Sequence, residues 1–172
     1  LIRYAMRFID SFVLFSPHMK EYLPVNNKIW IHMEGIYNTQ NSLKENVEKT
    51  KNKVILYTGK LSERMGIKNL LTAFSMIPNK EYRLWVRGNG ICLNDVKKAS
   101  EKDDRIQYIE HLSKEDILRL QRKATVLINP VFSSQKFTRY FFPSKTMEYM
   151  ASGTPTIMSR LACLPKDYYP FL

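Results

Sequence analysis

The sequence has little of what several protein classes require. Its 172 residues include only six glycines and two cysteines, too few for a collagen-like chain or a disulfide-stabilised scaffold. No apolar run approaches the ~18 residues of a membrane-spanning helix. Hydrophobic residues make up 44% and charged residues 25% of the chain, which excludes disorder as its main state and predicts a buried core. The length suits one domain, with room for part of a neighbouring one.

Residues that bind metals or form disulfides are few and scattered. Cys92 and Cys163 share no C-x-x-C spacing, and the three histidines show no H-x-x-x-H or H-E-x-x-H pattern. We therefore expect reduced, structural thiols in the cytosol and no metal site. The chain also starts at Leu1, without a methionine or a signal-peptide pattern, and we expect it to be a piece of a longer protein.

Positive charge exceeds negative charge, since 27 Lys and Arg stand against 16 Asp and Glu, a net charge of +11. The basic residues are scattered, and the densest groups are Lys49, Lys51, Lys53 and Arg119, Arg122, Lys123. A solvated surface explains this pattern, and attraction to an anionic membrane face is a second interpretation. Nucleic-acid binding would need one basic face with exposed aromatic side chains. Because the aromatic residues fall mostly on predicted strands and core faces, we predict no nucleic-acid partner.

Short apolar runs alternate with longer amphipathic stretches along the chain. The runs predict strands at 11–15, 28–32, 54–58, 82–87, 105–109, 125–129 and 154–157. The amphipathic stretches predict helices at 66–77, 91–101, 113–123 and 144–152. Strands that alternate with helices form parallel sheets, so the predicted fold is α/β, with a doubly wound, mostly parallel, Rossmann-like sheet.

The stretch 38–52 contains two aliphatic residues and much charge, which is typical of a linker. It separates the strand–helix–strand piece before it from the five-strand series after it. We therefore predict that residues 1–37 are the end of one domain, that residues 38–52 are a linker, and that residues 53–172 belong to a second domain.

Ligands of an open parallel sheet bind beyond the carboxyl ends of its strands, so the residues that follow the strands are candidates for a site. After the third predicted strand, Gly59 and Gly66 bracket a short turn that holds Lys60. Such a turn can offer backbone N–H groups and a cation to a phosphate. After the fourth strand, Gly88 and Gly90 allow a ligand to approach the backbone closely. An ordinary turn is the alternative for both segments.

The segment before the last predicted strand is the most informative. A helix that begins near Ser144 turns its N–H groups and partial positive charge outward, and Lys145 adds a full charge there. Together these groups suit a diphosphate. Glu148 lies on the same helix face, where a carboxylate can accept hydrogen bonds from two ribose hydroxyls. The alternative is a surface Lys–Glu pair, which contributes only about 0.2–0.5 kcal/mol.

These segments resemble a known family. The donor-site signature of the family 4 glycosyltransferases, F-P-S-K-x-x-E-Y-M-A-x-G-x-P-V-I, is similar to FPSKTMEYMASGTPTI in this sequence. The C-terminal domain of that family resembles VILYTGKLSERMGIKNLLTAF, RLWVRGNG and IQYIEHLSKEDILRLQRKATVLINP, in that order. The end of its N-terminal domain resembles FIDSFVLFSPHMKEYL followed by KIWIHMEGIYN. The resemblance covers nearly the whole chain.

The resemblance implies a GT-B architecture, in which two Rossmann-like domains face each other across a cleft. The C-terminal domain binds the nucleotide-sugar donor, and the N-terminal domain holds most of the acceptor site. Such enzymes retain the anomeric configuration without a metal, because positive charges and helix N-termini stabilise the leaving diphosphate. By position in the motifs, the implied diphosphate contacts are Gly59, Lys60, Ser144 and Lys145, and the implied ribose contact is Glu148.

Three positions depart from the family pattern. Met65 stands where the family has a second basic residue, and Tyr140 stands where many members have a glutamate that contacts the donor sugar. Glu110 replaces a glycine near the base, which would lie at the exit of the strand that ends at Ile109. Gly88, Ile109, Glu110 and Tyr140 are therefore the candidates for base and sugar contacts, and no catalytic residue is assigned.

We expect this chain to be the donor-binding part of a metal-independent, cofactor-free retaining glycosyltransferase, inactive alone because one wall of its cleft is missing. The expected donor is a UDP-sugar, with GDP as the alternative nucleotide. The expected acceptor is a glycan or lipid-linked molecule in the synthesis of a surface polysaccharide, such as capsule or lipopolysaccharide, or of a glycolipid. The basic charge fits a cytoplasmic enzyme that works peripherally at the inner membrane face.

The alternative is a non-catalytic Rossmann-like domain that binds a nucleotide or a partner protein. The two hypotheses differ in one structural expectation. Convergence of Lys60, Lys145 and Glu148 on one crevice would favour the enzyme, whereas a filled crevice or wide separation would favour the binding domain.

Overall fold

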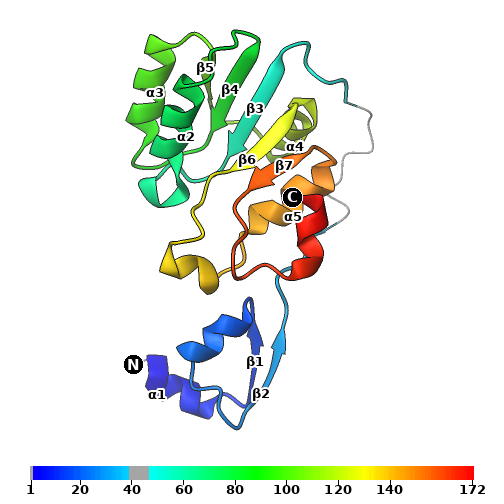
Figure 1. The fold of residues 1–172 in the computed structure, drawn as a ribbon. Coiled ribbons are helices and arrows are strands. Elements are labelled where there is room, and N and C mark those ends of the chain that lie inside the picture. Colours follow the sequence, from blue (N-terminus) through cyan, green and yellow to red (C-terminus); the bar gives the residue numbers. More distant parts are fainter. Residues whose placement is uncertain (1, 39–46) are drawn as a thin grey trace.

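The computed structural model describes residues 2–38 and 47–172. These residues form two parallel sheets, one of two strands near the N-terminus and one of five strands (Figure 1). The predicted linker at 38–52 lies in part outside the described residues. The division into three parts therefore stays a prediction.

The N-terminal sheet pairs two short strands. In chain order this piece contains α1 (Ile2–Ala5), η1 (Met6–Phe8), β1 (Ser11–Leu14), η2 (Pro17–Glu21) and β2 (Ile29–His32). β1 and β2 run parallel, with Ser11 opposite Ile29. Ser16 caps η2, because its hydroxyl accepts a hydrogen bond from the His18 N–H at 3.3 Å. The predicted strand–helix–strand order is confirmed, with a 3-10 helix between the strands.

The C-terminal sheet is a parallel sheet of Rossmann-like topology. Its strands are β3 (Lys53–Thr58), β4 (Tyr82–Arg87), β5 (Ile106–Ile109), β6 (Val126–Asn129) and β7 (Thr156–Met158). They run parallel in the spatial order β5-β4-β3-β6-β7. From β3 the chain adds β4 and β5 on one side, and it then adds β6 and β7 on the other side of β3. In such sheets the ligand crevice lies at the carboxyl ends of the strands where the direction changes, here β3 and β6. The predicted fold class is confirmed.

Helices cover both faces of this sheet. After β3 the chain forms η4 (Glu63–Met65), α2 (Ile67–Ser75), α3 (Leu93–Lys102), α4 (Lys114–Lys123), η5 (Lys136–Arg139), α5 (Ser144–Ser152) and η6 (Lys166–Phe171). α2 and α3 lie over one face, and α4 and α5 lie over the other (Figure 1). α4 begins after Ser113, whose hydroxyl accepts the Asp116 N–H at 3.1 Å. In the described part of the chain, no helix is both long and apolar enough to cross a membrane.

Alternating side chains of the strands build two cores, one on each face of the sheet. In β3, Tyr57 packs with Phe74 of α2, whereas Val54 and Leu56 pack with Tyr149 of α5. All five side chains are almost completely buried. Because a parallel sheet covered on both faces needs apolar residues on both, the strands read as continuous apolar runs.

β7 begins at Thr156, two residues later than the sequence predicts. The Thr154 hydroxyl donates a hydrogen bond to the Gln121 carbonyl at 2.9 Å, and its N–H donates to the Ser152 hydroxyl at 3.1 Å. Pro155 has no N–H to offer a neighbouring strand. The chain therefore joins the sheet first through the Pro155 carbonyl, which accepts a hydrogen bond from the Leu127 N–H of β6 at 2.8 Å.

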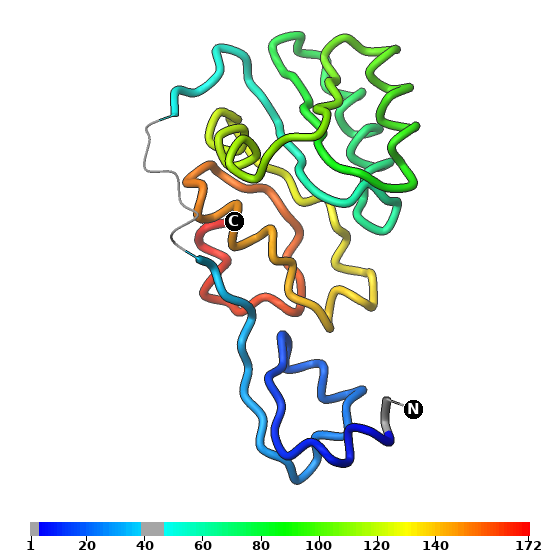
Figure 2. Tube along the Cα trace, turned by 180° about the vertical axis from the view of Figure 1, so that it is seen from behind, coloured from blue at the N-terminus to red at the C-terminus, as the bar shows by residue number. Residues whose placement is uncertain are grey.

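The N-terminal piece forms a separate lobe beside the loop that joins β6 to α5 (Figures 1 and 2). Past β2, residues 33–38 run along α5, and a Cβ on Gly35 would lie 3.1 Å from the Met147 sulfur. A third apolar cluster joins the β6–α5 loop to the C-terminal segment, through Val131, Phe142, Leu161, Cys163 and Leu164. This cluster supports α5 from the side away from the sheet.

Candidate donor-binding site

A buried tyrosine ties the end of β3 to α5. The β3–β6 pairing ends at Leu56, so the edge of Thr58 that faces α5 needs other partners. The Tyr149 hydroxyl accepts a hydrogen bond from the Thr58 N–H at 2.9 Å and donates to the Thr58 carbonyl at 3.2 Å. Burial raises the pKa of Tyr149 to about 12. Since Lys145 lies one turn before Tyr149, this contact fixes Lys145 beside Gly59, the residue after β3.

Lys145 is a buried cation without a hydrogen-bonding partner among the described residues. Its ammonium lies where a Cβ on Gly59 would be, and 4.2 Å from the centre of the Tyr57 ring. Burial lowers the pKa of Lys145 to about 8, and the Glu148 carboxylate acts in the opposite direction. A buried ammonium with unused donors favours an anion that can accept its hydrogen bonds.

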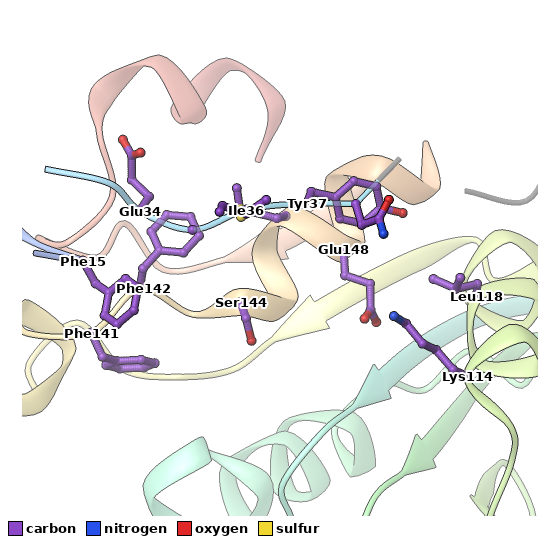
Figure 3. Close-up of a pocket in the computed structure, with 13 residues that line it drawn as sticks. Phe15, Glu34, Ile36, Tyr37, Lys114, Leu118, Phe141, Phe142, Ser144 and Glu148 are labelled. Atoms are coloured by element: carbon purple, nitrogen blue, oxygen red, sulfur yellow. The ribbon is translucent and has the colours of Figure 1, made fainter. Parts of the chain in front are cut away.

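A cavity of about 490 Å³ opens beside the first turns of α5, the helix that carries this lysine (Figure 3). Ser144 and Glu148 of α5 line it, and Glu148 points towards Lys114 of α4. Gln121 of α4 is fully buried and donates a hydrogen bond to the Glu148 carboxylate. The volume lies within the range of small-ligand pockets, about 300–1,000 Å³.

The N-terminal lobe supplies the opposite wall of this cavity. The segment after β2 contributes Glu34, Gly35, Ile36, Tyr37 and Asn38, and aromatic side chains contribute at one end, namely Phe15, Phe141 and Phe142. Glu34, Ile36 and Tyr37 follow each other along one side of the cavity in Figure 3. The cavity therefore lies between the two parts of the chain, and both parts are needed to form it.

A second cavity of about 400 Å³ adjoins the first, because Phe141 lines both. Lys60 and Arg64 bring positive charge to it, and the Arg64 guanidinium lies 3.8 Å from the centre of the Phe137 ring. Phe137 in turn stacks on Phe141, with ring centres 5.3 Å apart. Tyr140 completes the aromatic wall. A positively charged cavity with an aromatic wall thus borders the first cavity at Phe141.

Polar contacts join the N-terminal lobe to the rim of the second cavity. The Tyr140 hydroxyl donates to Glu21 at 2.8 Å, and Arg139 pairs with the same carboxylate at 2.8 Å. The fully buried Ser16 donates to the Arg139 carbonyl at 2.6 Å. Tyr22 packs edge-on against Tyr140 at 4.3 Å. We call this group the lobe junction.

The charged groups that line the two cavities are mostly cations, and the carboxylates of Glu34 and Glu148 line the first cavity. Lys114 lines the first cavity, Lys60 and Arg64 line the second, and Lys145 lies beside Gly59. The α5 N-terminus adds N–H groups. In the residues that the structure describes, no three His, Cys, Asp or Glu side chains gather as metal ligands. The groups available to a bound diphosphate are therefore the ammonium and guanidinium groups and the helix N-terminus.

Comparison with known proteins assigns the chain to a family. The family model described as glycosyl transferases group 1 matches residues 38–169. The chain belongs to this family. A search of curated proteins finds no match.

Solved structures share the fold of this glycosyltransferase chain at low sequence identity. Sucrose-phosphate synthase from Thermosynechococcus elongatus has a TM-score of 0.71 and 17% identity, over 93% of this chain and 43% of its own. HepE from Anabaena, solved with UDP and glucose, has a TM-score of 0.68 and 13% identity, over 91% and 46% of the two chains. The lipopolysaccharide outer core galactosyltransferase WaaB has a TM-score of 0.63 and 19% identity, over 94% and 46%. The chain thus spans less than half the length of these structures.

The structure brings together the residues that the sequence predicts for the diphosphate and the ribose. Gly59 and Lys145 are in contact, Ser144 and Glu148 line the first cavity, and Lys60 lines the adjoining one. Two strand exits and one helix N-terminus meet at this point. The contacts of each residue with a ligand stay predictions.

The residues predicted for the base and the sugar lie in different places. Gly88 packs against the exit of β3, where a Cβ would collide with the Gly59 carbonyl. Tyr140 lines the second cavity with its hydroxyl bonded to Glu21. Ile109 ends β5, and neither it nor Glu110 is among the residues that line the two cavities. Their roles also stay predictions.

The sequence interpretation missed every residue that lines the first cavity except Ser144 and Glu148, and it also missed Gln121 behind the Glu148 carboxylate. Lys114 and Leu118 of α4, together with Tyr37, line this cavity, and Gln121 bonds to its carboxylate. A local signal exists for Lys114 alone, because it follows the capping serine that begins α4. Leu118, Tyr37 and Gln121 reach the site through the packing of distant segments, which no local pattern reveals.

Proposed function

We propose that this chain binds the nucleotide-sugar donor of a retaining, metal-independent glycosyltransferase, with a UDP-sugar as the favoured donor. The observation that carries the proposal is the buried ammonium of Lys145, which lies against Gly59 without a hydrogen-bonding partner in the described residues. Ser144, the chain neighbour of this lysine, and Glu148, one turn further along α5, line the first cavity. The presence of UDP in the HepE structure supports the choice of nucleotide.

The two cavities suggest how a nucleotide-sugar lies in the site. Its diphosphate would contact Lys145 and the first N–H groups of α5, as anions do at helix N-termini. Its nucleoside would occupy the first cavity, with the ribose hydroxyls on Glu148. Its sugar would enter the second cavity, between Lys60 and the aromatic wall. The boundary that the two cavities share at Phe141 supports this arrangement.

The positive groups would also assist the chemistry. When the bond from the sugar to the diphosphate breaks, negative charge grows on the leaving oxygen, and preorganised donors stabilise it. Lys145, Lys60 and the α5 N-terminus supply that charge without a metal. Transfer with retention is tested by the anomeric proton of the product in an NMR spectrum, and metal independence by activity in excess chelator. Both tests use a protein that contains the acceptor-binding domain as well as this chain. An inverted product or loss of activity with chelator would contradict this part of the proposal.

The acceptor would be a glycan or a lipid-linked molecule in surface polysaccharide or glycolipid synthesis. The likeness to WaaB, a lipopolysaccharide galactosyltransferase, supports this class. The net charge of +11 supports a cytoplasmic protein that works peripherally at an anionic membrane face. Sedimentation with anionic vesicles tests this localisation: binding should weaken as salt rises, and salt-independent or absent binding would contradict it.

Calorimetric titration of the chain with UDP and with GDP tests donor binding. We expect one nucleotide to bind, and Lys145→Met and Glu148→Gln each to weaken binding at least about tenfold, because each removes a charged hydrogen-bond partner. Lys98→Met, on the exposed side of α3, removes the same charge elsewhere and should leave the affinity unchanged. No binding of either nucleotide at millimolar concentration would overturn the proposal.

A non-catalytic nucleotide-binding or partner-binding domain is the second candidate. The lobe junction favours it, because Tyr140 gives its hydroxyl to Glu21 instead of leaving it free in the second cavity. The two candidates differ in their response to the sugar. Tighter binding of one UDP-sugar than of UDP alone supports the enzyme, whereas equal affinity for UDP and every UDP-sugar supports the binding domain.

A further inference from the structure

Glu148 is held from inside the protein by Gln121. This glutamine lies on α4, is fully buried, and donates a hydrogen bond from Nε2 to Oε1 of Glu148. Its Nε2 also donates to the Thr58 hydroxyl at 3.3 Å. One amide therefore links the carboxylate on α5 to the end of β3, using both of its N–H donors.

The Gln121 amide fits this place in one orientation. Turning it over would set its oxygen against the Glu148 carboxylate, two acceptors without a proton between them. In the observed orientation Oε1 is buried and finds no hydrogen-bond partner within residues 2–38 and 47–172. A buried, unsatisfied oxygen destabilises a fold, so the two hydrogen bonds that the amide donates must offset this loss.

The surroundings of Gln121 restrict its movement. The main-chain carbonyl of Gln121 accepts a hydrogen bond from the Thr154 hydroxyl at 2.9 Å. The Thr58 hydroxyl, which accepts from the side-chain amide, also contacts the Tyr149 hydroxyl at 3.2 Å. Lys114 faces Glu148 from the cavity side (Figure 3), but it is exposed on the first turn of α4. A flexible surface ammonium does not fix the plane of a carboxylate, whereas a packed amide does.

We propose that Gln121 is a positioning residue for nucleotide recognition. By holding Oε1 of Glu148, it turns the second carboxylate oxygen, Oε2, towards the cavity, where Oε2 accepts hydrogen bonds from the ribose hydroxyls. The inference rests on the proposed function, because Glu148 meets a ribose if the cavity holds a nucleotide. It adds a specific consequence: the selection of ribose over a sugar without hydroxyls depends on Gln121.

Titration with two ligands separates this role from a structural one. We use UDP and 2′,3′-dideoxy-UDP, or the corresponding guanine pair if the chain selects GDP. The unmodified chain should bind UDP at least about tenfold more tightly than the dideoxy ligand, since hydrogen bonds to a charged group are worth that much. Gln121→Met keeps the side-chain length but removes the donors. It should lower the affinity for UDP and leave the affinity for the dideoxy ligand unchanged, so the ratio approaches one.

Two further variants complete the experiment. Gln107→Met removes a glutamine from the exposed side of the edge strand β5 and should preserve the ratio. Gln121→Glu can donate a hydrogen bond to Glu148 only when its own carboxyl is protonated. Its preference for UDP over the dideoxy ligand should therefore be absent at pH 8 and return at about pH 5.5. This variant keeps the inference testable if thermal unfolding shows that Gln121→Met does not fold.

Each outcome decides a different statement. If the unmodified chain binds no nucleotide, both the proposed function and this inference are overturned. If it binds UDP and the dideoxy ligand equally, donor binding stands, and the ribose contact and the role of Gln121 are overturned. If Gln121→Met weakens both ligands alike and keeps the ratio, the glutamine supports the fold alone and the inference is overturned. The inference is supported if the ratio of the two affinities falls to about one in Gln121→Met and stays unchanged in Gln107→Met.

Discussion

The two parallel sheets of this chain are built from similar strands but differ in what covers them. β1 and β2 expose apolar side chains, with Val13 at 56%, Ile29 at 75% and Ile31 at 51% exposure. In β3, Val54 and Leu56 are fully buried. All these residues lie in short β-branched or aliphatic runs paired in parallel. The strands are alike, so their surroundings make the difference.

The comparison shows that the apolar side chains of paired parallel strands form a core only when helices cover the sheet. α2 and α3 cover one face of the five-stranded sheet, and α4 and α5 cover the other (Figure 1). In the part of the chain that the structure describes, no such pair of layers encloses β1 and β2. Burial of apolar area, at about 25 cal/mol per Å², therefore stabilises the larger sheet far more than the smaller one.

The largest expected effect is on the core of β3. Leu56→Ala should lower the free energy of unfolding by about 2–5 kcal/mol, because it leaves a cavity between β3 and α5. Ile31→Ala, on the exposed side of β2, should change it by about 0.5 kcal/mol or less. Urea unfolding followed by circular dichroism measures both. Equal losses would show that the N-terminal sheet is as well packed as the larger one.

The second effect concerns the hydroxyl that joins β3 to α5. Tyr149→Phe should destabilise the chain by about 1–3 kcal/mol, because the buried Thr58 N–H loses its partner. Tyr22→Phe is the matched control in the N-terminal lobe, where the side chain is 56% exposed, and it should have little effect. Urea unfolding measures both variants. If Tyr149→Phe and Tyr22→Phe unfold at the same urea concentration, the Tyr149 hydroxyl does not anchor α5.

The third effect has the opposite sign. Lys145→Met should raise the free energy of unfolding by about 1–2 kcal/mol at pH 7, because it removes a buried charge whose pKa is lowered to about 8. Between pH 8 and 10.5 the unfolded lysine binds more protons than the folded one, so the stability of the unmodified chain rises with pH. The gap between the two chains should therefore close as pH rises through this window. A gap that widens would contradict the burial of this ammonium.

The smallest effect is on the lobe junction. Glu21→Gln should leave the unfolding midpoint unchanged, because the carboxylate is exposed and its contacts are screened by solvent. It should nevertheless loosen the N-terminal lobe and speed proteolytic cleavage at 33–38. The pKa of Glu21 is lowered, chiefly by the hydrogen bond from Tyr140, so its contribution is lost as pH falls through that lowered value. Identical cleavage in both chains would show that apolar contacts alone hold the lobe.

Much of the fold could be predicted from the sequence, because its signals are local. Apolar runs gave the strands, amphipathic periodicity gave α2 to α5, and Ser113 marked the start of α4. The prediction for β7 was wrong by two residues, since Thr154 bonds to the end of α4 and not to a strand. The family signature around Ser144 and Lys145 depends on a contiguous motif, and a contiguous motif is visible without a structure.

The sequence by itself determined the alternation of strands and helices, the direction of the sheet, and the motif that carries Lys145 and Glu148. These follow from short-range periodicity and from residues adjacent in the chain. The tertiary structure alone decided three things: Gln121 bonds to Glu148, Lys145 lies against Gly59 with no hydrogen-bonding partner among the described residues, and Glu21 accepts the Tyr140 hydroxyl. Those contacts join segments from 27 to 119 residues apart, or depend on burial. Burial is a property of the packed molecule, and no stretch of sequence contains it.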